Sequence, residues 1–218
     1  MAFPTFIHEL KHWKDNKFVI GIDEVGRGAF AGPMYIGGVI FPNNMQNDLL
    51  DEILQNGIND SKLLSKKRRE VLTEYIKKTA LFCTVTSISV EDINKIGVGK
   101  AGKLGFEYAS RTLTVKLAAE NPPNTTHILT DAFEIDKYEF PNQTPLVHGD
   151  RLSITIAAAS IIAKVARDRH MEELSKKFPE YKWEENKGYG TSSHREALVK
   201  FGKTIHHRKD FIRNYISE

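Results

Sequence analysis

Cysteine is almost absent from the sequence. Cys83 is the only one among 218 residues, so neither an intrachain disulfide framework nor a thiol-rich metal site is possible. It lies in a β-like run at residues 81–85, where no neighbour in sequence is arranged to activate a thiol. We therefore interpret Cys83 as a small buried apolar residue, and the composition fits a cytoplasmic protein.

Long apolar runs are lacking as well. No stretch approaches the roughly 20 residues that span a bilayer, and the start, MAFPT, has neither the basic nor the apolar region of a signal peptide. Repeats, linkers and low-complexity tracts are also missing. With 40% hydrophobic and 27% charged residues, the composition is ordinary for a globular protein, which we expect to be monomeric and independent of membranes.

The chain has little net charge, but its positive charge is unevenly distributed along the sequence. The net charge is +3, yet residues 61–79 carry +5, residues 186–218 carry +4 and the remainder carries −6. Such gathering is expected of a protein that binds phosphate groups, although a solvated basic helix face produces the same pattern.

Hydrophobic periodicity predicts the order of the elements. Strands are predicted over residues 18–23, 34–41, 81–90 and 127–131, with a short β segment at 145–147. Helices are predicted over residues 65–79, with Ser65 as the N-cap, over 100–120 and 153–178, and from about 191 onward. The glycine-rich connection ending at Pro33 predicts a hairpin of the first two strands. This order favours an α/β fold with a mixed sheet flanked by helices.

Carboxylates stand where the predicted strands end. Asp23 and Glu24 close the first strand, Asp131 closes the fourth, and Asp150 precedes the long helix. Acidic residues are poor strand formers and are costly to bury unless they are paired or bound to metal. If these side chains converge, they form the all-oxygen cage that Mg²⁺ or Mn²⁺ favours. Spacing alone leaves open a helix cap for Asp150, a surface ion pair for Glu24 and a turn for Asp131.

Adjacent residues of a regular strand point to opposite faces, so Asp23 and Glu24 cannot share a site in an undistorted strand. Gly26 and Gly28 follow closely. We therefore predict that the chain leaves the strand at about Glu24, which frees that side chain to turn back toward Asp23.

Five ordered blocks resemble the signatures of type II ribonucleases H and together span nearly the whole chain. They are residues 21–33 (GIDEVGRG with AGP), 59–68 (NDSK with LS and KR), Asp131 at its strand end, 149–169 (GDRLS, AAASIIAKV and RDR), and 188–208 (GYGT, His194 and HR).

The resemblance implies a ribonuclease H-like catalytic domain over residues 1–185, with a helical substrate-binding region over residues 186–218 packed on it. The implied substrates are RNA/DNA hybrids and DNA duplexes that contain ribonucleotides, cut on the 5′ side of a ribonucleotide to leave 5′-phosphate and 3′-hydroxyl ends. Two Mg²⁺ or Mn²⁺ ions, about 3.5–4 Å apart, would serve the reaction. The implied metal ligands are Asp23, Glu24, Asp131 and Asp150.

Substrate contacts are implied at seven further positions. The backbone of Gly26, Arg27 and Gly28 would read the ribose 2′-hydroxyl, the group that separates RNA from DNA. Tyr189, flanked by glycines, would stack on the next sugar, although a tyrosine packed at a loop edge is the plainer interpretation. Lys62 and Arg208, with Lys209, are candidate phosphate contacts.

Other polar residues receive structural interpretations. Asp168 lies inside the long predicted helix, and we interpret it as a member of an ion pair. His148, His206 and His207 would titrate near neutrality if unperturbed, but structural or phosphate-contacting roles suit them better than metal ligation in an oxygen-rich site.

The sequence departs from the family pattern at three places. His148 replaces a lysine before the Gly-Asp pair, Ala132-Phe133 replaces Gly-Asn, and Gly97-Val98 stands where Asn-Ile is usual. None removes a ligand, but the missing asparagine removes one expected contact to the DNA strand.

Three rival interpretations remain. A type III relative would need an extra N-terminal domain, and only about twenty residues precede the first predicted strand. A glycosidase would use an acidic pair but would leave Asp131, Asp150 and the basic segments unexplained. A non-catalytic nucleic-acid-binding module of the same fold predicts binding without cleavage.

Overall fold

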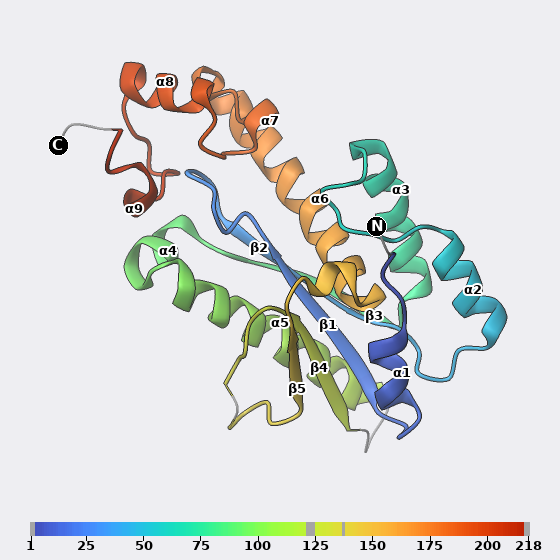
Figure 1. Cartoon of the computed structure of the whole chain (residues 1–218). Helices are drawn as coiled ribbons and strands as arrows, with labels where there is room; N and C mark the ends of the chain where they lie inside the picture. The colour runs from blue at the N-terminus through green and yellow to red at the C-terminus, as the bar shows by residue number, and fades with distance from the viewer. Residues whose placement is uncertain (1–2, 121–124, 137, 216–218) are drawn as a thin grey trace.

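A mixed five-stranded sheet organises the chain (Figure 1). The computed structural model describes residues 3–120, 125–136 and 138–215, so residues 216–218 of the predicted C-terminal region lie outside the described residues. The strands are β1 (Phe18–Val25), β2 (Met34–Ile40), β3 (Phe82–Ile88), β4 (Thr126–Asp131) and β5 (Gln143–Leu146). Their order across the sheet is β3-β2-β1-β4-β5.

Strand pairing confirms the predicted mixed sheet. β1 and β2 form the predicted antiparallel hairpin, and β3 pairs antiparallel with β2. β4 lies parallel to β1 on the other side, and β5 lies parallel to β4. The carboxyl ends of β1, β4 and β5 therefore meet at one end of the sheet, where the acidic residues stand.

The predicted long helices are present within a few residues of their expected bounds. Two short helices, Ser192–Phe201 and Lys209–Ile212, lie in the C-terminal part that was predicted to be helical, and the other short helices were not predicted. Ser65 caps its helix as expected, accepting a hydrogen bond from the Arg68 amide. The α-helices are α1 (Ile7–Trp13), α2 (Asn47–Gln55), α3 (Lys66–Thr79), α4 (Val90–Ile96), α5 (Val98–Glu120), α6 (Ile154–Lys177), α7 (Trp183–Asn186), α8 (Ser192–Phe201) and α9 (Lys209–Ile212), and the 3₁₀ turns are η1 (Gly149–Arg151) and η2 (Pro179–Tyr181). Among these, α1, α2, α4 and α7 were missed from the sequence.

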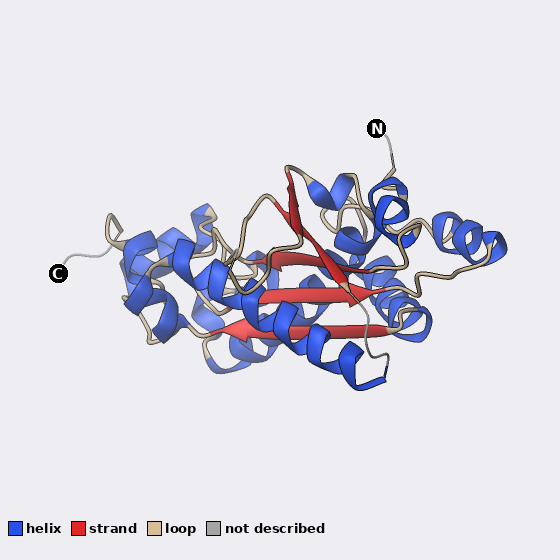
Figure 2. Ribbon diagram, turned by 90° about the horizontal axis from the view of Figure 1, so that it is seen from below, coloured by secondary structure: helices blue, strands red, loops and turns tan. Residues whose placement is uncertain are grey.

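Helices cover both faces of the sheet (Figure 2). One core cluster joins the sheet to α1, α2, α3 and α6, and the other joins it to α4 and α5. Small residues let α6 lie directly on the strands: a Cβ at Gly37 of β2 would overlap the carbonyl of Ala159. This close approach brings α6 beside the carboxyl end of β1.

A third cluster packs the C-terminal part against the end of α6 and the loop after β1 (Figure 1). Trp183 and Tyr181, which precede the predicted boundary at residue 185, share this cluster with Leu198 and Ile212, which follow it. Within the described residues, no helix is both long and apolar enough to cross a membrane.

Glu9 fastens α1 to the start of α6. Its Oε1 accepts hydrogen bonds from the Ser153 hydroxyl at 2.5 Å and the Thr155 amide at 2.9 Å, whereas its buried Oε2 has no partner within the part of the chain that the structure describes. Burial raises the pKa of Glu9 above its ordinary value, despite the hydrogen bond from Ser153. The folded state therefore binds the Glu9 proton more tightly than the unfolded state does.

Glu9→Gln should raise the melting temperature at pH 8 more than at pH 4.5. The stability that a raised carboxyl pKa contributes is present below the unfolded value and is lost as the pH rises through the folded value. Glutamine keeps the acceptor oxygen and carries no charge, and each kcal/mol gained is worth about 2–4 °C in a domain of this size. Thermal unfolding at both pH values, with exposed Glu196→Gln as the control, measures the difference. An equal shift at both would contradict the assignment.

Candidate active site

A cleft of about 430 Å³ opens at the carboxyl end of β1. Pairing between β1 and β4 stops at Ile22 and Thr130, whereas β1 continues to Val25. The cleft forms beside this unpaired end of β1. Its lining residues are Asp23, Glu24, Val25, Gly26, Arg27, Gly28, Ser61, Lys62, Asp131, Ser160, Lys164 and Tyr189.

The prediction that the chain leaves the strand at Glu24 is wrong. Glu24 stays in register with Ile36 of β2, and Val25 with Tyr35. Both acids nevertheless line the cleft, and both lie in the part of β1 beyond its pairing with β4. The Asp23 side chain also turns along the backbone, since its Oδ1 accepts a hydrogen bond from the Glu24 amide at 2.7 Å.

Local hydrogen bonds hold the other two predicted ligands. Asp131, at the end of β4, accepts the Gly149 amide on Oδ1 at 2.7 Å, which joins β4 to η1. Asp150 lies within η1 beside Lys62, whose Nζ is 3.9 Å from its Oδ2. Asp150 does not line the cleft itself, although its charge raises the pKa of Asp23.

The acidic side chains repel one another in a poorly hydrated place. Burial, followed by the charges of Glu24 and Asp131, raises the pKa of Asp23 well above its ordinary range, while a hydrogen bond from Ser160 opposes the shift. Burial also raises the pKa of Glu24 to about 7, against the opposing charge of Arg27. Bringing these carboxylates together costs free energy that a cation would offset.

The donor set suits a hard divalent cation. Glu24 Oε2 is buried and has no hydrogen-bond partner among the described residues, so it retains a free acceptor toward a ligand. Carboxylate oxygens are the ligands that Mg²⁺ and Mn²⁺ prefer. In the described part of the chain, no group of three or more acidic, histidine or cysteine side chains is already placed to hold a metal ion, so further oxygen donors would be needed to complete the coordination.

Arg27 is held between an acid and an aromatic ring. Its Nη1 is 3.7 Å from Glu24 Oε1, and its guanidinium carbon lies 4.1 Å from the centre of the Phe133 ring. Phe133 is one of the departures from the family pattern, so this stacking contact with Arg27 occupies a position where the family usually has asparagine.

Four cleft residues, Val25, Ser61, Ser160 and Lys164, were given no role from the sequence. Ser160 of α6 shares a 2.9 Å hydrogen bond with Ser61, and Lys164 lies one turn farther along the same helix. Ser160 and Lys164 could have been found from the sequence, because they lie one helical turn apart in the block that resembles the family.

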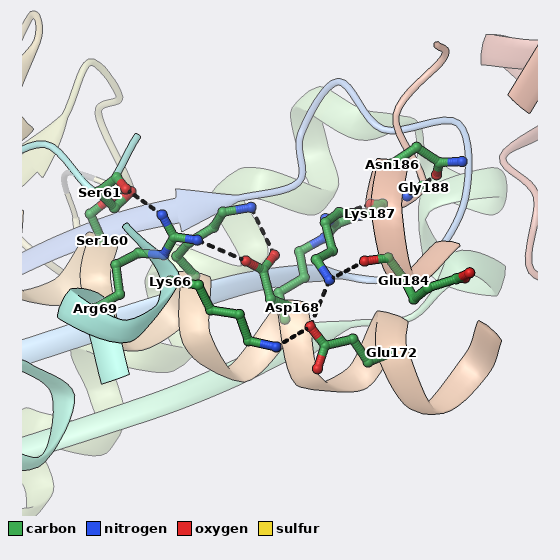
Figure 3. Close-up of polar contacts among 12 residues, drawn as sticks. Ser61, Lys66, Arg69, Ser160, Asp168, Glu172, Glu184, Asn186, Lys187 and Gly188 are labelled. Carbon is green, nitrogen blue, oxygen red and sulfur yellow. Dashed lines mark hydrogen bonds and ion pairs between the residues drawn. The ribbon is translucent and has the colours of Figure 1, made fainter. Parts of the chain in front are cut away.

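The interpretation of Asp168 as a member of an ion pair is confirmed (Figure 3). It binds Lys164 at 2.7 Å and Arg69 at 3.4 Å. Arg69 also donates to the carbonyls of Ser61 and Leu64, so Asp168 links α6 to the segment that carries Lys62.

The two glycines around Arg27 have different surroundings. Gly26 has a φ of +91°, and a Cβ there would overlap the Arg167 side chain. Gly28 is exposed, is not in the positive-φ region, and a Cβ there would meet nothing within 4 Å. The fold requires glycine at position 26 but not at position 28. Tyr189 is half-buried and lines the cleft on the far side of Arg167, whose guanidinium carbon is 5.3 Å from its ring centre.

Arg208 does not occupy the position expected of a phosphate contact. Its side chain is completely buried, and its guanidinium donates to the carbonyls of Gly32 and Arg27 at 2.8–3.0 Å. The physical reason is that the carbonyls of Arg27 and Gly32, in the loop after β1, accept hydrogen bonds from this side chain, which is far away in sequence. Arg208 therefore supports the Gly26–Arg27–Gly28 backbone from beneath.

Two histidines of the C-terminal part have structural roles. His207 Nε2 is 3.1 Å from His194 Nε2, and the Trp183 indole donates to the same His194 nitrogen at 3.2 Å. Burial, with the neighbouring His194, lowers the pKa of His207 to about 3, so it does not titrate near neutrality. His194 Nδ1 lies 3.0 Å from the Tyr189 carbonyl and ties this cluster to the cleft.

One residue at each of the three departures from the family pattern has a positive φ. Ala132 has φ +61° and His148 has φ +58°, both in the left-handed region, and Gly97 ends α4 at φ +81° and ψ 152°. Glycine alone adopts the Gly97 conformation readily. Ala132 carries a strain of about 1–2 kcal/mol that a glycine would avoid.

Comparisons with known proteins agree with this geometry. The family model described as Ribonuclease HII matches residues 20–215. The ribonuclease HII of Wolbachia sp. subsp. Brugia malayi (strain TRS) is 41% identical over 211 residues, which cover 97% of this chain and 94% of the relative. That of Lactobacillus gasseri is 39% identical over 209 residues, covering 94% of this chain and 75% of the relative.

Solved structures share the fold. A chain in the PCNA:RNase HII complex from Archaeoglobus fulgidus matches with a TM-score of 0.68 and 25% identity, covering 92% of this chain and 97% of that one. Bst-RNase HIII in complex with Mn²⁺ matches with a TM-score of 0.66 and 21% identity, covering 88% and 65%. The family match extends from β1 to the C-terminal part, and the chain belongs to the ribonuclease HII family of endoribonucleases.

Proposed function

We propose that the enzyme hydrolyses the RNA strand of RNA/DNA hybrids and nicks duplex DNA on the 5′ side of a single embedded ribonucleotide. The observation that carries this proposal is the composition of one cleft. Asp23, Glu24 and Asp131 line it together with Gly28 and Tyr189. Groups suited to cutting a phosphodiester and groups suited to recognising a ribose therefore face the same bound strand.

Asp23, Glu24, Asp131 and Asp150 would hold two Mg²⁺ or Mn²⁺ ions, with phosphate oxygens of the substrate completing the coordination. Bound there, such ions supply an activated water and stabilise charge on the leaving oxygen. Water attacks phosphorus, the bond to the 3′ oxygen breaks, and that oxygen takes a proton. The products are a 3′-hydroxyl and a 5′-phosphate.

Basic residues at the cleft would hold the nucleic-acid backbone. Lys62 is 78% exposed at the rim and has an acidic neighbour only at 3.9 Å, so its ammonium is free to contact phosphate. The C-terminal part contributes Tyr189, in keeping with a substrate-binding role for residues 186–218.

The deciding assay uses a DNA duplex with one ribonucleotide, in Mg²⁺, in Mn²⁺ and with chelator. The expected result is a single nick 5′ to the ribonucleotide that requires the metal, and no cut in an all-DNA duplex. Binding of the duplex without metal-dependent nicking would instead support a non-catalytic nucleic-acid-binding module.

Tyr189→Ala should reduce cutting at a single ribonucleotide by about 10-fold, and cutting within RNA runs much less. Loss of an aromatic stacking contact costs about 1–3 kcal/mol, and a deoxyribose next to the ribonucleotide admits the ring best. Measuring kcat/KM on both substrates gives the ratio. Equal losses on the two substrates would contradict the stacking role.

A further inference from the structure

Arg167 of α6 is a buried cation bonded to three separate carbonyls. Its side chain is completely inaccessible. Nε donates to Pro33 at 3.1 Å, Nη2 to Ala31 at 3.2 Å and Nη1 to Lys187 at 2.9 Å. Across the part of the chain that the structure describes, it forms no ion pair with a carboxylate.

The three acceptors belong to two segments that flank the cleft. Pro33 and Ala31 lie in the loop that begins with Gly26, and Lys187 lies two residues before Tyr189. Each nitrogen of one rigid, planar group therefore fixes one of these segments relative to the other.

The same guanidinium contacts both substrate-facing elements directly. Gly26 packs against it so closely that a Cβ would overlap the arginine. The Tyr189 ring also lies near it, with 5.3 Å between the guanidinium carbon and the ring centre. One guanidinium therefore contacts both Gly26 and Tyr189, so its position bears on the spacing between them.

Stability alone does not explain a charge at this position. Burial lowers the pKa of Arg167, and Arg208, also buried, adds a second positive charge nearby. Apolar side chains of similar volume often replace buried charges at no loss of stability. A guanidinium at this point supplies fixed geometry that an apolar side chain would not.

We propose that Arg167 is a positioning residue that sets the enzyme's selectivity for the junction between a ribonucleotide and the following deoxyribonucleotide. It does so by fixing the spacing between the Gly26–Arg27–Gly28 backbone and Tyr189. The inference rests on the proposed function. Because a displacement of about 1 Å costs up to about 10²-fold in rate, a small change in this spacing alters recognition of one sugar pair without removing either contact.

The test compares Arg167→Lys with the matched control Arg169→Lys, which changes an exposed arginine two residues along the same helix. Lysine keeps the charge and replaces only some of the three hydrogen bonds. We expect Arg167→Lys to lower kcat/KM at a single embedded ribonucleotide about 10-fold and within an RNA/DNA hybrid no more than about 2-fold. Arg169→Lys should leave both unchanged.

Thermal unfolding and a double-mutant cycle separate positioning from simple destabilisation. If Arg167 acts through Tyr189, Arg167→Lys should change the selectivity ratio little in a Tyr189→Ala background. The selectivity ratio is kcat/KM at a single embedded ribonucleotide divided by kcat/KM within an RNA/DNA hybrid. If Arg167→Lys lowers both values equally, so that this ratio is unchanged, the inference is overturned while the proposed function remains intact. A wild-type enzyme that fails to nick the ribonucleotide would instead overturn the proposed function.

Discussion

Asp23→Asn should abolish cleavage and leave binding of the RNA/DNA hybrid intact. Asp23 is 4% exposed at the base of the cleft and is the side chain on which the charges of Glu24, Asp131 and Asp150 converge. Removing its charge weakens the site for divalent ions, whose contribution of several kcal/mol corresponds to about 10³-fold or more in rate. Asparagine keeps an oxygen that accepts the Glu24 amide, so the backbone has no reason to move.

Single-turnover cleavage and hybrid affinity, measured on the same preparation, separate these effects. The loss of one negative charge in the cleft should leave affinity for a polyanion equal or slightly higher. Asp51→Asn, on the exposed surface of α2, is the matched control and should cut at the wild-type rate. Turnover retained by Asp23→Asn would remove Asp23 from the metal site.

Local sequence patterns were sufficient to predict much of this site. Asp23 and Asp131 could be placed at strand ends because each follows a run of apolar residues, and the change from apolar to polar residues along the chain indicates where a strand ends. The placement of Glu24 depends instead on where β4 stops pairing with β1, at Ile22 and Thr130. That is a property of two strands more than a hundred residues apart, and periodicity within one strand carries no information about it.

Arg208 shows the same limit more strongly. A cation in a basic C-terminal segment is expected at the surface, where its charge is hydrated. Its acceptor on Gly32 lies 176 positions earlier in the chain, and nothing near Arg208 in sequence indicates a buried carbonyl. Arg167 was likewise noted only as part of a block that resembles the family.

The short helices were missed for a different reason. α1 has seven residues, which is below the length at which helical periodicity becomes distinct. α2 did carry a signal, since Leu49, Leu50 and Ile53 have helical spacing and pack on the core. Neither helix lines the cleft, so these errors did not alter the predicted chemistry.

Gly28→Ala should leave the fold unchanged and reduce cutting at a single ribonucleotide by about 10²-fold. A Cβ at Gly28 would meet no described residue within 4 Å, and its backbone is not in the positive-φ region. We therefore expect that methyl group to obstruct the bound substrate and not the fold. If the backbone here contacts the ribose 2′-hydroxyl, a displacement of about 1 Å accounts for a loss of this size.

Gly26→Ala is the companion variant that makes the result specific. Its φ of +91° and its overlap with Arg167 predict a lower melting temperature, at about 2–4 °C for each kcal/mol lost. Gly28→Ala should therefore reduce the cleavage activity and leave the melting temperature at the wild-type value. Gly26→Ala should reduce both the activity and the melting temperature. If Gly28→Ala cuts at the wild-type rate, the backbone at position 28 does not approach the ribose, and recognition must come from Arg27 or Tyr189.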